Sequence, residues 1–176
     1  GVLAPNTYRF DITTNKRDIF LKMKNRQKQI IDTAWNNRSA DLPLKNSLEL
    51  LILASIVEKE AGNEEDKKKV ASVFLNRLEK KMRLQSDPTV IYGLTLGKKP
   101  LGRPLTKSDL RKYSEFNTYI IKGLPPNPIC NPGEDALKAA ANPANSKFYY
   151  YVSNGIGGHF FSKNLAEHNK NVKLYK

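Results

Sequence analysis

The stretch from Leu48 to Val57 constrains the fold more than any other part of the chain, because it is apolar on almost every side of a helix. A helix of this kind must be buried. Asn46 and Ser47 precede the stretch, and Glu49 stands where it can close a capping box. We therefore expect a buried central helix that begins at about residue 47.

Amphipathic helices are predicted on both sides of this central helix. Apolar residues at helical spacing between Ile19 and Ala34 predict one of them, and the pattern from Val70 to Leu78 predicts the other. Gly62 is expected to end the central helix in a left-handed conformation. Helices joined by so short a turn should pack as neighbours.

The middle of the chain is predicted to be less regular. Prolines and glycines interrupt residues 83–104, which we expect to form a loop. A short helix is predicted from Thr106 and a brief strand over residues 117–121. The order of Asn131, Pro132 and an acid predicts a further helix that runs to about Asn142.

The C-terminal part carries the only strong strand pattern. Residues 148–152 and 159–161 are rich in aromatic residues and flank a glycine-rich turn, which predicts a β-hairpin. Ser162 is expected to cap a last helix that continues through Tyr175. The prediction is an α+β fold, mostly helical, with a small antiparallel sheet near the C-terminus.

Composition narrows the possible partners only slightly. Lys and Arg number 30 against 17 Asp and Glu, which gives a formal charge of +13. This excess favours nucleic acid, anionic lipid or an acidic wall polymer, without choosing among them. Cys130 is the single cysteine, so it cannot form an intramolecular disulfide, and we interpret it as an incidental thiol.

The central helix ends in the charged triplet Glu58-Lys59-Glu60. At about 100° per residue, the two glutamates point roughly 200° apart and cannot form a pair on one face. Each follows residues of its own face that would partly desolvate a carboxyl and raise its pKa, as a general acid requires. A buried helix reaching the surface would produce the same pattern, and periodicity does not separate Glu58 from Glu60.

A second polar cluster spans residues 83–93, with the sequence Arg-Leu-Gln-Ser-Asp-Pro-Thr-Val-Ile-Tyr-Gly. Its amide, hydroxyl, carboxylate and aromatic groups are the mixture that a sugar-binding site uses. A capped connector rich in turns is an equally good interpretation of the same residues.

These segments resemble the MltG (YceG-like) endolytic murein transglycosylases. The resemblance is carried by the ordered motifs Ile52–Glu60, Val70–Leu78, Met82–Gly93, Asn117–Tyr119, Gly123–Pro126, Asn131–Gly133, Ala136–Ala140, Gly157–Phe161 and Asn164–Asn169. It covers the chain from about Leu48 to the C-terminus and implies a mostly helical, lysozyme-like catalytic domain.

In that family the catalytic acid is the second glutamate of the triplet, which falls on Glu60. The resemblance implies cleavage of the β-1,4 bond between N-acetylmuramic acid (MurNAc) and N-acetylglucosamine (GlcNAc) within peptidoglycan strands. Glu60 would protonate the glycosidic oxygen and then accept the proton of the muramoyl C6 hydroxyl, which closes a 1,6-anhydro ring. One glutamate suffices, unlike in two-carboxylate glycosidases.

Five further residues of the matching motifs are candidates for binding the glycan: Gln85, Asp87, Tyr92, Asn117 and Tyr119. Two departures from the family pattern are Ala61, where members typically carry Thr, and the loop between Gly93 and Thr106. His159 and His168 lack the ligand spacing of a zinc site. We expect no metal and no cofactor.

The resemblance also implies a larger protein. We expect residues 1–176 to be a single catalytic domain with a helical lead-in over residues 1–45, cut from a membrane-anchored protein. The residues contain no membrane span and no signal peptide. The parent would act beside peptidoglycan synthases at the extracytoplasmic face of the cell membrane.

Two alternatives remain at this stage. A lysozyme-like hydrolase would use Glu60 as acid and Asp87 to activate water. A non-catalytic module would bind the cell wall through charge. No nucleic-acid-binding motif is present, so a nucleic-acid partner is not expected.

Overall fold

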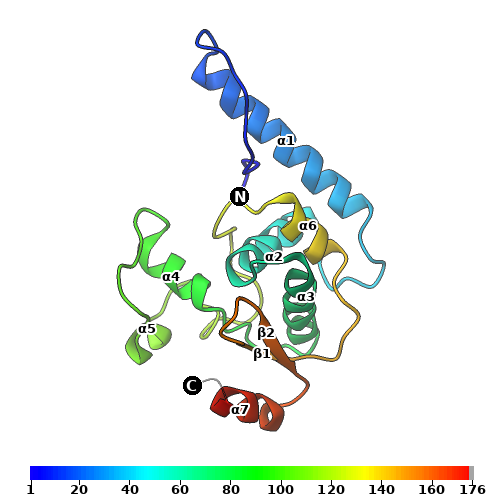
Figure 1. Ribbon diagram of the computed structural model, residues 1–176, viewed down its shortest axis with the longest axis vertical. Coiled ribbons are helices and arrows are strands. Elements are labelled where there is room, and N and C mark those ends of the chain that lie inside the picture. Colours follow the sequence, from blue (N-terminus) through cyan, green and yellow to red (C-terminus); the bar gives the residue numbers. More distant parts are fainter. Residues whose placement is uncertain (175–176) are drawn as a thin grey trace.

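The computed structural model describes residues 1–174 and confirms a mostly helical fold with one antiparallel hairpin near the C-terminus (Figure 1). In this range no helix is both long and apolar enough to cross a membrane. The elements are α1 (Lys16–Asn36), α2 (Ser47–Glu60), α3 (Glu64–Glu79), α4 (Asp87–Thr95), α5 (Lys107–Arg111), α6 (Glu134–Ala141), β1 (Tyr150–Ser153), β2 (His159–Ser162) and α7 (Leu165–Leu174).

The predicted central helix is α2, and it is surrounded as its sequence requires. Every residue from Leu50 to Val57 is buried. Helices α3 and α6 pack against α2 and against each other, and α1 packs on α2 and α6. Because α2 forms the centre of this core, its last residues occupy a fixed position at the edge of the core.

Helix α1 extends away from this core, and the N-terminal segment of the chain runs along its first half (Figure 1). Its buried residues, Gln27, Ile30 and Ala34, all lie in its second half. Gln27 Nε2 donates to the carbonyl oxygen of Pro132 at 3.0 Å, which fixes α1 to the segment before α6. The single-domain assignment remains a prediction.

Helix α4 corrects the prediction that residues 83–104 form a loop. Pro88 occupies the first turn of α4, where a missing N–H costs no intrahelical hydrogen bond. Leu96 ends the helix in the left-handed conformation at φ 50°. The Asp-Pro pair therefore begins a helix here, although the same pair often marks a turn.

Several predicted helix ends and one strand are also corrected. Helix α2 ends at Glu60, the next residue Ala61 has an extended backbone, and Gly62 does not have a positive φ. The Glu49 carboxylate accepts from Lys45 N, one residue before the capping residue Asn46. Residues 117–121 form turns, because Ile120 N and Ile121 N both donate to the Asn117 carbonyl.

The ends of the last two helices differ from the prediction as well. Helix α6 begins at Glu134 after Gly133, whereas the side chain of Asn131 accepts from Leu3 N. Ser162 belongs to β2 and does not cap α7. Tyr175, the predicted end of the last helix, lies outside the described residues.

The hairpin was predicted correctly, and it covers one edge of the helical core. Strands β1 and β2 pair in antiparallel register, with Tyr151 opposite Phe161. The rings of Tyr151 and Phe74, in α3, meet edge to face with centroids 6.0 Å apart. Helix α7 packs on both strands. The hairpin is therefore held next to the C-terminal end of α2, where the glutamates lie.

Candidate functional site

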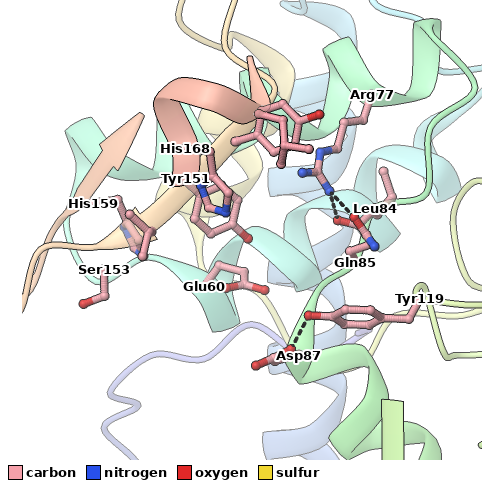
Figure 2. Close-up of a pocket in the computed structure, with 13 residues that line it drawn as sticks. Glu60, Arg77, Leu84, Gln85, Asp87, Tyr119, Tyr151, Ser153, His159 and His168 are labelled. Carbon is pink, nitrogen blue, oxygen red and sulfur yellow. Dashed lines mark hydrogen bonds between the residues drawn. The ribbon is translucent and has the colours of Figure 1, made fainter. Parts of the chain in front are cut away.

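A cavity of about 460 Å³ lies at the C-terminal end of α2, between the hairpin and the segment that leads into α4. Figure 2 shows Glu60 with Tyr151 on one side and Asp87 on the other. The residues that line the cavity are Glu60, Arg77, Leu84, Gln85, Asp87, Tyr119, Tyr150, Tyr151, Val152, Ser153, His159, Leu165 and His168.

The Glu60 carboxyl is held by two hydroxyl groups. Ser86 Oγ donates to Glu60 Oε1 at 2.6 Å, and the Tyr151 phenol donates a second hydrogen bond. Burial raises the pKa of Glu60 and outweighs these two hydrogen bonds, which lower it; the charge of Asp87 raises it further. A carboxyl in these surroundings keeps its proton to a higher pH than an exposed glutamate, as a general acid requires.

Ser86 is held in position by two buried threonines. Its backbone N–H donates to Thr118 Oγ1 at 2.9 Å, and its carbonyl accepts from Thr89 Oγ1 at 2.6 Å. The two threonine hydroxyls lie 2.8 Å apart. All three residues are at most 1% exposed, so the donor to Glu60 is fixed by the core and not by solvent.

Asp87 and Tyr119 form a second polar pair in the cavity. The Tyr119 phenol donates to Asp87 Oδ1 at 2.6 Å (Figure 2). Burial and this hydrogen bond raise the pKa of the Tyr119 phenol, so the phenol remains a proton donor. Asp87 is exposed at the first position of α4 and is therefore open to a ligand in the cavity.

The structure brings three of the five predicted binding residues to the cavity, namely Gln85, Asp87 and Tyr119. Tyr92 and Asn117 do not line it. The Tyr92 ring packs on Phe116 with centroids 4.8 Å apart. Asn117 is 1% exposed and donates to two backbone carbonyls, so it stabilises the fold of its own segment.

Glu58 lies outside the cavity lining and has different partners. Its Oε2 atom accepts from Gly133 N at 3.2 Å and lies 3.6 Å from Lys67 Nζ. Glu58 therefore holds the segment before α6 against α2 and α3. This separation of Glu58 from Glu60 is the distinction that periodicity left open.

Sequence reasoning did not select several cavity residues, including Ser86, Arg77 and Tyr151. Ser86 lay within the polar cluster that was noted, whereas Arg77 and Tyr151 matched ordinary helix and strand patterns. His159 does line the cavity. Its Nδ1 atom lies 3.1 Å from Asp66 Oδ2, and its ring meets Tyr151 edge to face at 5.2 Å.

The side chains that could bind a metal ion, and the single cysteine, do not form a further site in the described residues. Within residues 1–174, no group of three or more His, Cys, Asp or Glu side chains is arranged to hold a metal ion. Cys130 Sγ donates to the Ser55 carbonyl at 3.2 Å, and burial raises the pKa of the thiol to about 11. A thiol with so high a pKa is a poor nucleophile at neutral pH.

Comparison with known proteins points to one family. The YceG-like family pattern matches residues 1–174. The crystal structure of a YceG-like protein from Listeria monocytogenes superimposes with a TM-score of 0.82 at 38% identity, over 97% of this chain and 54% of that one.

Two curated relatives carry the name endolytic murein transglycosylase. The protein of Bacillus subtilis (strain 168) is 39% identical over 99% of this chain and 47% of its own length. That of Streptococcus pneumoniae (strain D39) is 31% identical over 98% of this chain and 31% of its own length. The chain thus spans about half or less of the length of these relatives. With both fold and sequence matched over nearly all its length, this chain belongs to the YceG-like family.

Proposed function

We propose that this chain is the glycan-cleaving part of an endolytic lytic transglycosylase that acts on peptidoglycan, with Glu60 as its general acid and base. The observation that carries the proposal is the partly buried Glu60 carboxyl, whose pKa is raised by desolvation and which lines an open cavity. The names of the B. subtilis and S. pneumoniae relatives support the choice of murein as substrate.

Cleavage needs one carboxyl that changes its role. Protonated Glu60 donates to the glycosidic oxygen between MurNAc and GlcNAc as the C1–O bond breaks. The resulting carboxylate accepts the proton of the muramoyl C6 hydroxyl, whose oxygen bonds to C1. The Ser86 and Tyr151 hydroxyls stabilise the carboxylate in the interval. Glu60 is protonated again at the end, and no water is consumed.

Hydrolysis is the second candidate, because Asp87 lines the same cavity and is exposed. There Asp87 would activate a water molecule that attacks C1 in place of the C6 hydroxyl. Its Oδ1 atom already accepts a hydrogen bond from Tyr119, and for this reason we favour the transglycosylase.

The test is digestion of purified peptidoglycan by the protein and by Glu60→Gln, with mass spectrometry of the soluble products. We expect 1,6-anhydromuramoyl ends from the unsubstituted protein and no products from the variant. Reducing ends lost in Glu60→Gln would establish the hydrolase instead. Products that persist in the variant would reject Glu60 as the acid.

The wider setting is also part of the proposal. A membrane anchor outside this chain would hold the domain at the extracytoplasmic face of the cell membrane, where nascent glycan strands and peptidoglycan synthases are found. Exclusively cytoplasmic fractionation of the full-length protein would reject this location.

A further inference from the structure

Arg77 is a cavity residue whose charge the proposed reaction does not use. Arg77 is only 7% exposed, although it lines the cavity. Nε donates to the Tyr149 carbonyl at 2.6 Å, and Nη1 donates to the Leu84 carbonyl at 2.8 Å. These bonds connect α3 to the segments that precede β1 and α4. Arg77 thus has a structural role, and the acceptors of these hydrogen bonds are uncharged.

The positive charge of Arg77 is not compensated by an acid. Across residues 1–174, no Asp or Glu oxygen lies within ion-pair distance of its guanidinium. Carbonyl oxygens satisfy N–H groups without cancelling a net charge. Burial lowers the pKa of Arg77, which shows that the charged form is disfavoured where it lies. A desolvated cation of this kind gains free energy when an anion binds beside it.

The neighbours of Arg77 on the cavity wall add a second polar atom. The guanidinium lies 5.2 Å from the centre of the Tyr150 ring. The His168 ring stacks on the same Tyr150 ring, with the two ring centroids 5.3 Å apart. His168 Nδ1 is buried and has no hydrogen-bond partner within residues 1–174. Burial and the charge of Arg77 lower the pKa of His168, so its imidazole stays neutral and the positive charge of this wall belongs to Arg77 alone. Arg77, with Tyr150 and His168 packed beside it, is called the cationic wall below.

We propose that the cationic wall is a subsite for a carboxylate carried by the 3-O-lactyl substituent of muramic acid, either its own carboxylate or one on the attached peptide. The proposal rests on the function proposed above. Nε and Nη1 of Arg77 are engaged by protein acceptors, and Nη2 has no hydrogen-bond partner in residues 1–174, so a carboxylate would bind through Nη2. In a murein strand only every second sugar carries the lactyl substituent. GlcNAc has none.

Such a subsite would determine which glycosidic bond reaches Glu60. The proposed reaction needs MurNAc, and not GlcNAc, on the C1 side of the cleaved bond. Two sugars that share the same ring and N-acetyl group differ mainly in the lactyl substituent. Recognition of that substituent by the cationic wall would set the strand in the register that places alternate bonds at Glu60.

The experiment measures the affinity of three sugars for the full chain carrying Glu60→Gln, by calorimetry. Chitotetraose carries no carboxylate, the peptide-free GlcNAc–MurNAc tetrasaccharide has free lactyl carboxylates, and the same tetrasaccharide with stem peptides has carboxylates on the peptide. We expect at least one of the two MurNAc sugars to bind about tenfold more tightly than chitotetraose, as for a hydrogen bond to a charged group. The sugar that gains identifies the source of the carboxylate.

Substitution of Arg77 separates recognition from folding. In Arg77→Gln, the affinity of the preferred MurNAc sugar relative to that of chitotetraose should fall to near one. Arg77→Lys keeps the charge and should restore part of this ratio. The ratio within one variant is insensitive to the fraction that is folded. Lys99→Gln removes one charge from the exposed loop after α4 and should leave the ratio unchanged.

Two results would overturn the subsite. Equal affinity for chitotetraose and both MurNAc sugars would reject it and leave the proposed function intact. A preference that persists unchanged in both Arg77 variants would assign recognition to other residues. If none of the three sugars binds, the proposed function fails together with the subsite.

Discussion

Glu58 and Glu60 are two residues apart on one helix, yet their surroundings differ in every respect that matters for chemistry. Glu58 accepts from a backbone N–H and lies beside Lys67, so its carboxylate is paired. Glu60 has no cationic partner within ion-pair distance in the described residues and accepts only from hydroxyls. The half-turn between them directs one toward packing and the other into a cavity. A carboxyl becomes a proton donor through burial without a counter-charge.

The largest expected difference is in catalysis. Glu60→Gln should reduce the rate of glycan cleavage about a thousandfold, since general acid catalysis contributes that order of acceleration. Glu58→Gln keeps an acceptor for Gly133 N and should retain activity to within a few-fold. Release of soluble fragments from labelled peptidoglycan measures both variants. An equal loss of activity in the two variants would contradict the different roles assigned to Glu58 and Glu60.

The sequence identified this helix end as a candidate site but could not choose between its two glutamates. The apolar run identified α2 and its burial, but both glutamates followed suitable neighbours, so only the family resemblance selected Glu60. What separates them lies elsewhere in the chain: Gly133 beside one, Ser86 and Tyr151 beside the other. Such partners, 26 or more residues away in sequence, carry no periodic signal.

The misses have the same origin. Asp-Pro was interpreted as a break, although Pro88 suits a first helical turn, and so α4 was missed. Tyr92 and Asn117 belong to polar or aromatic motifs, but the fold uses them for packing and for backbone hydrogen bonds. Motif membership selected segments from which Gln85, Asp87 and Tyr119 line the cavity. The side of each segment that faces the cavity depends on tertiary contacts.

Stability should rank the two glutamates in the opposite order. Glu58→Ala removes the acceptor of Gly133 N and leaves Lys67 without its partner, so we expect a loss of about 1–2 kcal/mol in the free energy of unfolding. Urea denaturation at neutral pH measures it. The matched variant Glu60→Ala should cost less, because it removes a desolvated carboxylate. A greater loss for Glu60→Ala would contradict the assignment of Glu58 as the structural member.

The pH dependence of stability provides a smaller but more specific signal. The pKa of Glu60 is raised in the folded state above its ordinary value of 4.5, so the folded chain binds this proton more tightly than the unfolded chain. Stability from this group is therefore full below pH 4.5 and is lost as pH rises through the folded pKa. Glu60→Gln should melt at a higher temperature than the unsubstituted protein at neutral pH.

That advantage of Glu60→Gln should shrink as the pH falls toward 4.5, because the carboxyl is then protonated in both states. Differential scanning calorimetry across this range, with Glu58→Gln as the matched control, measures the difference. An advantage that is independent of pH would show that the gain has a cause other than the ionisation of Glu60.

The smallest expected effects are shifts in the pH profile of cleavage, and their signs differ between two neighbours of Glu60. The proposed reaction requires protonated Glu60, so kcat/KM should fall as pH rises through its pKa. Asp87 raises that pKa and the Ser86 hydrogen bond lowers it. Asp87→Asn should therefore move the fall to lower pH, and Ser86→Ala should move it to higher pH. The midpoint of the fall can be determined even if either substitution lowers the maximum rate. Shifts in the same direction would mean that the profile follows another group, and the contrast between a paired and an unpaired glutamate would then not support the proposed catalytic role of Glu60.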